Sequence, residues 1–279
     1  MSLVQPYIAH IDSDFRQNGT HSHFNYTITL PNNRVFDRVA VLSASIPKSF
    51  YLVDGSSAER SFTITEDGSS AVISLTAGNY SIRSLAKQLT NLLNAGSPNG
   101  YTYSVTYPAV DDVQTGKVTF RVSDNTGVQP ILSFGSSSKV WRTMGFESNS
   151  SNVFSSNELV SVNVPLLSIG EIFVKSSVVK AETNSISDSI LCSINIINAP
   201  DFSAIAYQPS TDLLFTSKPF SGHTGDSYSF VVVDNNGNIL NFNGVSCNID
   251  LVFFKFDDVN QMQKQHMLMS WFNDVANSS

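Results

Sequence analysis

The feature that most constrains this chain is a period-two alternation of apolar and polar residues, repeated in short runs. The runs are rich in Val, Ile, Thr, Phe and Tyr, and clusters of Gly, Asn, Asp and Ser separate them. Such alternation turns one side of a strand toward a core and the other toward solvent. The sequence therefore predicts an all-β fold of many short strands.

The strand-like runs fall into two blocks. They are YIAHID (7–12), FNYTITL (24–30) and VFDRVAVLSASIP (35–47), then ELVSVNV (158–164), EIFVKSSVV (171–179), SILCSINII (189–197), DLLFTS (212–217), YSFVVVD (228–234), NILNF (238–242) and CNIDLVFFKF (247–256). Together they can form two facing four-stranded sheets, which is the arrangement of a single jelly-roll β-sandwich. Because Asn-Gly turns join the last three runs, we expect those runs to form a meander.

The segment between the two blocks has a different pattern. Short strand-like runs surround GNYSIRSLAKQLTNLLNAG, in which Leu residues recur at helical spacing, Ser81 can cap the start and Gly96 follows the end. We therefore expect residues 57–150 to form a small inserted α+β unit, and residues 1–56 and 151–256 to form the jelly-roll core. The alternative is that the helix covers one sheet of a single barrel.

Residues 257–279 predict a C-terminal amphipathic helix or tail. Asp257 or Asp258 can cap its start, and an apolar stripe follows at helical spacing. The stripe contains Val259, Met262, His266, Met269 and Phe272, widened by Leu268, Trp271 and Val275. Such a stripe either packs on its own barrel or reaches a neighbour. The single Lys264 on the polar face argues against a helix that lies on a membrane.

Charge composition limits the partners of this chain. Only 14% of the residues are charged, the net charge is −7, and no run of three Lys or Arg occurs, so we expect no specific nucleic-acid binding. No apolar run is long enough for a membrane span, and the start lacks the pattern of a signal peptide. We expect a soluble protein made in a reducing cytosol, with Cys192 and Cys247 as buried thiols inside strands.

The search for catalytic, cofactor-binding or metal-binding residues returns two candidate sites, and each has a simpler explanation. Strand alternation would place His10, Asp12 and Asp14 on one face, and His21 and His23 on one face, around the polar turn DSDFRQNGTHSH, and these residue types can bind a metal. These are also ordinary loop residues. The turn DNNGN (234–238) imitates part of a calcium loop but lacks the closing Glu, and a hairpin turn explains it better. The acid pairs Asp111-Asp112 and Asp257-Asp258 fit solvated turn and helix-start positions. We therefore predict no site residues, no cofactor and no enzymatic activity, although a glycosidase-type carboxylate pair leaves no local signature.

Several phrases in order resemble the penton or minor capsid proteins of virophages and polinton-like viruses, of the Mavirus type. They are NYTITLPNNRVFDRVAVLSASIPKSFYLV, LTAGNYSIRSLAKQLTNLLNA, KVTFRVSD, MGF and YSFVVVDNNGNILNFNGVSCNIDLVFFKF, within residues 7–256. The resemblance implies a single jelly roll, present as a homopentamer at the five-fold vertices of a virion. Its partners would be major capsid proteins with two jelly rolls each. Topology, and not the resemblance, suggests that the inserted unit projects outward, where it could contact a host or companion-virus surface. The resemblance brings no active-site residues.

Two other classes of protein remain open. A receptor-binding or glycan-binding module, such as a lectin-like jelly roll or a fibre head, could stack sugars on Trp141, Trp271 or the nine tyrosines. Glycan binding and a trimeric state would distinguish it. A jelly-roll enzyme that acts on polysaccharide would show hydrolysis that is lost when one Asp or Glu is changed.

Overall fold

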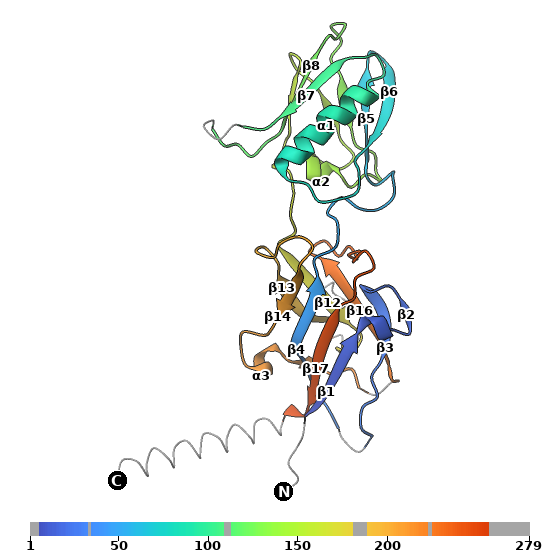
Figure 1. Ribbon diagram of the computed structural model, residues 1–279, viewed down its shortest axis with the longest axis vertical. Helices are drawn as coiled ribbons and strands as arrows, with labels where there is room; N and C mark the ends of the chain where they lie inside the picture. Colours follow the sequence, from blue (N-terminus) through green and yellow to red (C-terminus); the bar gives the residue numbers. More distant parts are fainter. Residues whose placement is uncertain (1–5, 33–34, 109–112, 181–188, 223–224, 257–279) are drawn as a thin grey trace, which may run out of the picture. The chain divides into compact units, whose positions relative to one another are not determined.

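The chain folds into two compact units that are mostly β-sheet, as the alternating pattern predicts (Figure 1). The computed structural model describes residues 6–32, 35–108, 113–180, 189–222 and 225–256. Unit 1 comprises Met1–Phe50 and Gly170–Ser279, and unit 2 comprises Tyr51–Ile169. The chain thus leaves unit 1 after Phe50 and returns to it at Gly170.

Unit 1 contains two five-stranded antiparallel sheets. Sheet A has the strand order β1-β17-β4-β14, with β15 also paired to β4, and sheet B has the order β13-β12-β16-β3-β2. The strands of sheet A are β1 (Tyr7–Asp12), β4 (Arg38–Pro47), β14 (Ala204–Tyr207), β15 (Lys218–Pro219) and β17 (Asn248–Phe254). The strands of sheet B are β2 (Asn18–Gly19), β3 (His23–Thr27), β12 (Glu171–Ser176), β13 (Ile190–Asn195) and β16 (Ser227–Asp234). The helical turns η1 (Ser13–Phe15) and α3 (Leu213–Thr216) complete the unit.

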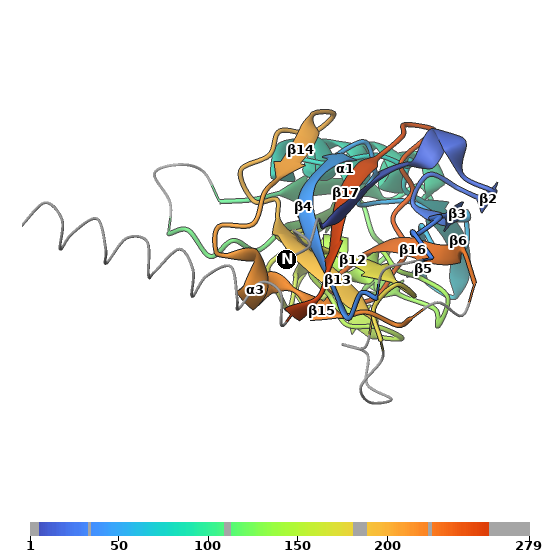
Figure 2. The same cartoon turned by 90° about the horizontal axis from the view of Figure 1, so that it is seen from below.

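Aromatic rings join the two sheets of unit 1 through their inner faces. Phe220 meets Phe253 of sheet A edge-on, with 5.2 Å between ring centroids, and lies 6.3 Å from Tyr228 of sheet B. Within sheet B, Phe24 stacks on its cross-strand partner Phe230 at 5.5 Å. Rings buried in this way contribute large apolar areas. The core of unit 1 therefore lies between the facing sheets (Figure 2).

Unit 2 contains a four-stranded sheet in the order β10-β9-β5-β6 and a three-stranded sheet in the order β11-β8-β7. Its elements are β5 (Ser61–Glu66), β6 (Ser69–Ser74), α1 (Ile82–Gly96), β7 (Thr102–Thr106), β8 (Thr119–Ser123), β9 (Ile131–Ser133), α2 (Trp141–Met144), β10 (Ser151–Val153) and β11 (Glu158–Val160). Ser81 begins α1 with a capping box to Ser84, and Leu85, Leu89 and Leu93 bury its apolar face, as the spacing predicts. One core joins α1 to both sheets.

The predicted meander is wrong. β16 lies in sheet B and β17 in sheet A. Residues 238–242 turn back along β16 through the isolated bridge between Val233 and Ile239 and the bond from Leu240 N–H to the Val232 carbonyl, but they do not form a strand. Leu240 and Phe242 are both buried. The alternating burial in NILNF therefore comes from the connection between sheet B and sheet A, which places two side chains in the core. In sequence, such a connection shows the same alternation as a strand.

Two further expectations differ from the structure. Residues 212–217, expected as a strand, contain the short helix α3, in which Ser217 N–H donates to the carbonyl of Leu213. Residues 151–164, expected in the jelly-roll core, contain β10 and β11, which pair with β9 and β8 of unit 2. The return to unit 1 falls at Gly170, beyond the expected boundary at 150. The expected helix at 257–279 lies outside the described residues.

Candidate functional site

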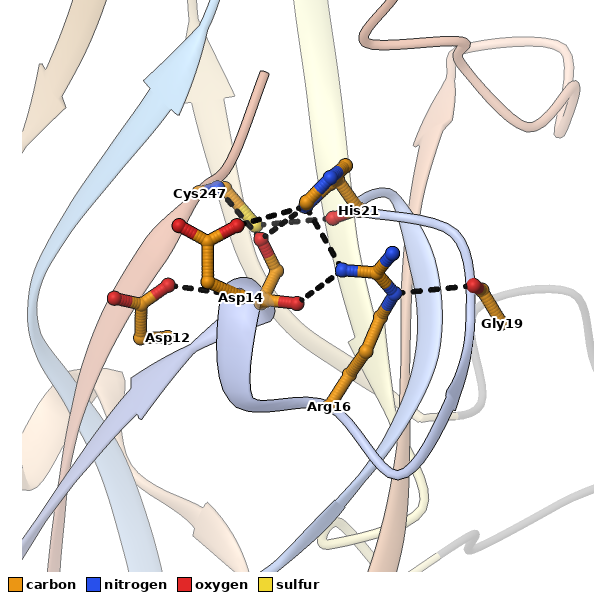
Figure 3. Close-up of polar contacts among 7 residues, drawn as sticks. Asp12, Asp14, Arg16, Gly19, His21 and Cys247 are labelled. Carbon is orange, nitrogen blue, oxygen red and sulfur yellow. Dashed lines mark hydrogen bonds and ion pairs between the residues drawn. The ribbon is translucent and has the colours of Figure 1, made fainter. Parts of the chain in front are cut away.

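The polar turn after β1 forms a compact hydrogen-bonded cluster around His21 (Figure 3). The Ser13 hydroxyl lies 3.1 Å from His21 Nδ1, and Arg16 Nη1 lies 3.2 Å from the same nitrogen. Arg16 also donates to the carbonyls of Ser13, at 2.7 Å, and Gly19, at 3.1 Å. Because Cys247 N–H donates to Ser13 Oγ at 2.9 Å, the cluster ties this turn to the start of β17.

This arrangement does not have the geometry of a Ser-His-Asp triad. In a triad the serine and the carboxylate contact opposite nitrogens of the imidazole. Here the Ser13 hydroxyl and Asp14 Oδ1, at 3.6 Å, both approach Nδ1 of His21. Ser13 is also fully buried. With two donors directed at Nδ1, the ring is a hydrogen-bond acceptor there, and the cluster acts as a structural tie.

The five residues that could bind a metal are mostly separated. His10 lies on the outer face of sheet A, where its Nδ1 is 2.7 Å from Asp250 Oδ1, and the exposed His23 begins β3. Asp12 caps η1 by accepting the N–H of Asp14 at 2.9 Å. Among the residues that the structure describes, no group of three His, Cys, Asp or Glu could hold a metal ion. Beside His21, the guanidinium of Arg16 occupies the position that a cation would take.

The turn at residues 234–238 is held by the carboxylate of Asp234. Oδ1 of Asp234 accepts the N–H groups of Asn236 and Asn238, each at 2.8 Å, and Oδ2 accepts the Asn238 side-chain amide at 2.9 Å. Gly237 adopts the positive φ of 82° that such a turn requires. These bonds and the bridge between Val233 and Ile239 form a tight turn after β16, which agrees with the hairpin-turn interpretation.

Other predicted candidates are buried, covered or outside the described residues. Cys192 and Cys247 are buried thiols, and burial raises the pKa of Cys192 to about 12 and that of Cys247 to about 11. The guanidinium of Arg142 lies 4.7 Å above the ring of Trp141, so one face of the best sugar-stacking candidate is already covered. The pairs Asp111-Asp112 and Asp257-Asp258 lie outside the described residues, as does Trp271.

Sequence reasoning did not single out the exposed apolar side chains of unit 1, which include Phe15 and Ile197. Phe15 in η1 is 77% exposed, and Ile197 in the segment between β13 and β14 is 68% exposed. Phe15 lies next to β3, while β14 and α3 lie on the opposite side of the unit from β2 and β3 (Figure 1, Figure 2). Contiguous apolar patches left in water often mark an interface, whereas single exposed apolar side chains are common on protein surfaces. Alternation did not reveal them, because Phe15 lies in η1 and Ile197, the last residue of the run expected as a strand over 189–197, lies beyond the end of β13.

Within the described part of the chain, no helix has both the length and the apolar character needed to cross a membrane. No protein-family model and no curated protein matches the sequence. Among solved structures, the chain is similar to the mavirus penton protein at 12% identity and a TM-score of 0.41, over 91% of this chain and 92% of that one. A TM-score of this size does not establish a shared fold.

Proposed function

We propose that this chain is a non-enzymatic structural protein of a viral capsid, the penton subunit of which five copies close each five-fold vertex. Its unit 1 would be a single jelly roll, and its neighbours would be major capsid proteins with two jelly rolls each. It would be made in the host cytoplasm and reside in the virion. The strand pairing of unit 1 is the observation that carries this proposal.

Eight strands of unit 1 pair as a long hairpin rolled into a sandwich. In chain order they are β1, β3, β4, β12, β13, β14, β16 and β17. The first pairs with the eighth, the second with the seventh, the third with the sixth and the fourth with the fifth. This nested pairing, split over two facing sheets, is the pattern of a jelly roll, an architecture frequent in viral capsid proteins. It supports the proposed capsid role.

The surface of unit 1 suits a closed ring. A ring of five copies uses heterologous contacts, in which one surface of each subunit meets a different surface of the next. Phe15 and Ile197 give unit 1 apolar side chains in two different regions. The low charge of the chain reduces the cost of burying such surfaces, because few ions lose their hydration. We infer that the region around Phe15 meets the region around Ile197 of the next copy.

Unit 2 would serve as the outward-facing part of the vertex. It occupies the connection between the third and fourth strands of the jelly-roll pattern, so it can vary without changing the strand order. In this role unit 2 would contact a host or companion-virus surface. That residues 57–150 fold as an independent insertion remains a prediction, and stable folding of an expressed fragment covering residues 51–169 would test it.

The proposal is tested by the mass of the purified chain in solution, measured by light scattering coupled to size exclusion, with imaging of the largest species. A five-membered ring, or incorporation at vertices when the chain is mixed with a double jelly-roll major capsid protein, supports the penton role. A stable trimer that binds glycans would favour the fibre-head alternative. A chain that remains monomeric and is excluded from assembled shells would refute the proposal.

A further inference from the structure

The outer face of sheet A is divided into a polar part and an apolar part. Odd-numbered residues of β17, such as Phe253, point into the core, so even-numbered ones point outward. In the polar part, Asp250 accepts a hydrogen bond from Ser43 at 2.6 Å and contacts His10. Further along β17, Val252 and Phe254 take the outward positions. The outer face of a sandwich is normally polar along its whole length.

Among the residues that the structure describes, the apolar part is covered only at its centre. Ala40, Val252 and Phe254 are buried there, with Leu42 and Leu213 packed against them. Around this centre, apolar side chains remain in water: Ile8, which pairs with Val252, is 47% exposed, and Phe215 on α3 is 86% exposed. We call these seven residues the apolar end of sheet A. Since α3 packs on β4, this surface is continuous from the edge strand β1 toward α3 (Figure 1).

The described chain ends next to this surface. Phe254 is the last residue of β17, and Phe256 follows it with its N–H donating to Asp37 Oδ1 at 2.8 Å. The guanidinium of Arg38 lies 5.2 Å above the Phe256 ring. These contacts fix the point from which residues 257–279 continue.

The sequence of residues 257–279 fits a partner for an apolar surface. Its apolar stripe at helical spacing includes Met262, Met269 and Trp271, and Met side chains adapt well to irregular surfaces. A helix over residues 259–275 would be about 25 Å long, which fits along the ten-residue β4, about 33 Å long. A short helix is marginal in water unless its apolar side packs on something.

We propose that the apolar stripe of residues 257–279 docks on the apolar end of sheet A in the same chain. The tether at Phe256 makes the local concentration of the segment on the order of millimolar, far above that of a second copy in dilute solution. The docked segment would cover Ile8 and Phe215, and it would complete the outer face of unit 1. This inference concerns a different surface from the one proposed for the ring and does not depend on it.

Trp271 reports on docking in the full chain. The change Trp141→Phe leaves Trp271 as the only tryptophan. We expect the Trp271 emission to be blue-shifted and only weakly quenched by acrylamide. Both effects should be independent of protein concentration, at concentrations too low for the ring to form. The changes Ile8→Ser and Phe215→Ser should each lower the ratio of docked to free segment by roughly tenfold, because each removes apolar area from the contact. Phe215 is so exposed that its replacement should not disturb folding.

The control is Phe15→Ser, which removes another highly exposed ring from a different part of unit 1. It should leave the Trp271 emission unchanged, and circular dichroism checks that each variant is folded. Emission typical of a solvated tryptophan in the parent protein would overturn the proposal. So would shielding that persists in both Ile8→Ser and Phe215→Ser, or shielding that grows with concentration, since the latter would place the segment on a second copy.

Discussion

Glu66 at the end of β5 is a fully buried carboxylate on which the stability of unit 2 should depend. It accepts hydrogen bonds from the Tyr103 hydroxyl at 2.8 Å, from Asn99 N–H at 2.8 Å and from the Ser97 hydroxyl at 2.8 and 2.9 Å. These donors lie in β7 and in the connection between α1 and β7. The carboxylate therefore links the end of β5 to β7 and the connection before it, which follow β5 in the chain after β6 and α1.

The change Glu66→Gln keeps the volume but replaces one acceptor oxygen by an amide donor. A hydrogen bond to a charged acceptor contributes about 1.5–3 kcal/mol, and one to a neutral acceptor about 1 kcal/mol. Weakening three such bonds, partly offset by removal of a buried charge, should lower the free energy of unfolding of unit 2 by about 2 kcal/mol. Tyr103→Phe removes one bond and should cost about 1.5–2 kcal/mol.

Urea unfolding followed by Trp141 fluorescence, in a Trp271→Phe background, measures the stability of unit 2, because Trp141 begins α2. If Glu66 and Tyr103 interact directly, the double variant should lose less than the sum of the single losses, by about 1 kcal/mol. The exposed Glu147 gives a matched control, and Glu147→Gln should change stability by less than about 0.5 kcal/mol. A Glu66→Gln variant as stable as this control would refute the reasoning.

Three further predictions follow from the same structure. Because burial raises the pKa values of Cys192 and Cys247, neither thiol should react with a disulfide reagent near neutral pH until the protein unfolds; rapid reaction of either would contradict their burial. Hydrogen bonds from Lys139 and Ser56 lower the pKa of Glu59 from 4.5 to about 2. The ionised Glu59 should therefore add at most about 1 kcal/mol to the stability at this partly exposed site, and this stabilisation should be present above pH 4.5 and lost as the pH falls toward 2. In acid unfolding, Glu59→Gln should not show this loss of stability between pH 4.5 and 2. Phe15→Asp and Ile197→Asp should each lower the mass of the assembly in light scattering, because each places a charge in the proposed contact between subunits. Val72→Asp, at a similarly exposed position of unit 2, should leave that mass unchanged. Five-membered rings that form with both changes would show that these surfaces are not the contact between subunits.

The local parts of the fold could be predicted from sequence, because they depend on neighbours along the chain. Period-two alternation located most strands, and the spacing of Leu85, Leu89 and Leu93 after Ser81 located α1. The assignment of strands to sheets could not be predicted in the same way. Leu240 and Phe242 alternate as strand residues do, but they anchor a crossing segment between sheets. Alternation records burial of one face, and it does not record which strand lies alongside.

The polar features show the same limit. His21 was recognisable as a candidate, but its role depends on Arg16 and on Cys247, which directly precedes β17 and is distant in sequence. Glu66 gave no signal, because an acid before Asp67-Gly68 is typical of a solvated turn. Its burial results from donors supplied by the α1–β7 connection. Tertiary contacts, and not local pattern, decide which polar side chains are structural.

The two surfaces proposed for unit 1 can be separated by one comparison. If residues 257–279 dock on their own sheet A, Phe215→Ser should expose Trp271 while leaving the mass of the ring unchanged. If the segment instead crosses to the next subunit and helps to hold the ring, the same change should lower both the shielding and the mass. Phe15→Asp gives the opposite test, because it should break the ring and leave Trp271 shielded. Measuring both quantities on both variants therefore tests the ring contact and the docked segment independently of each other.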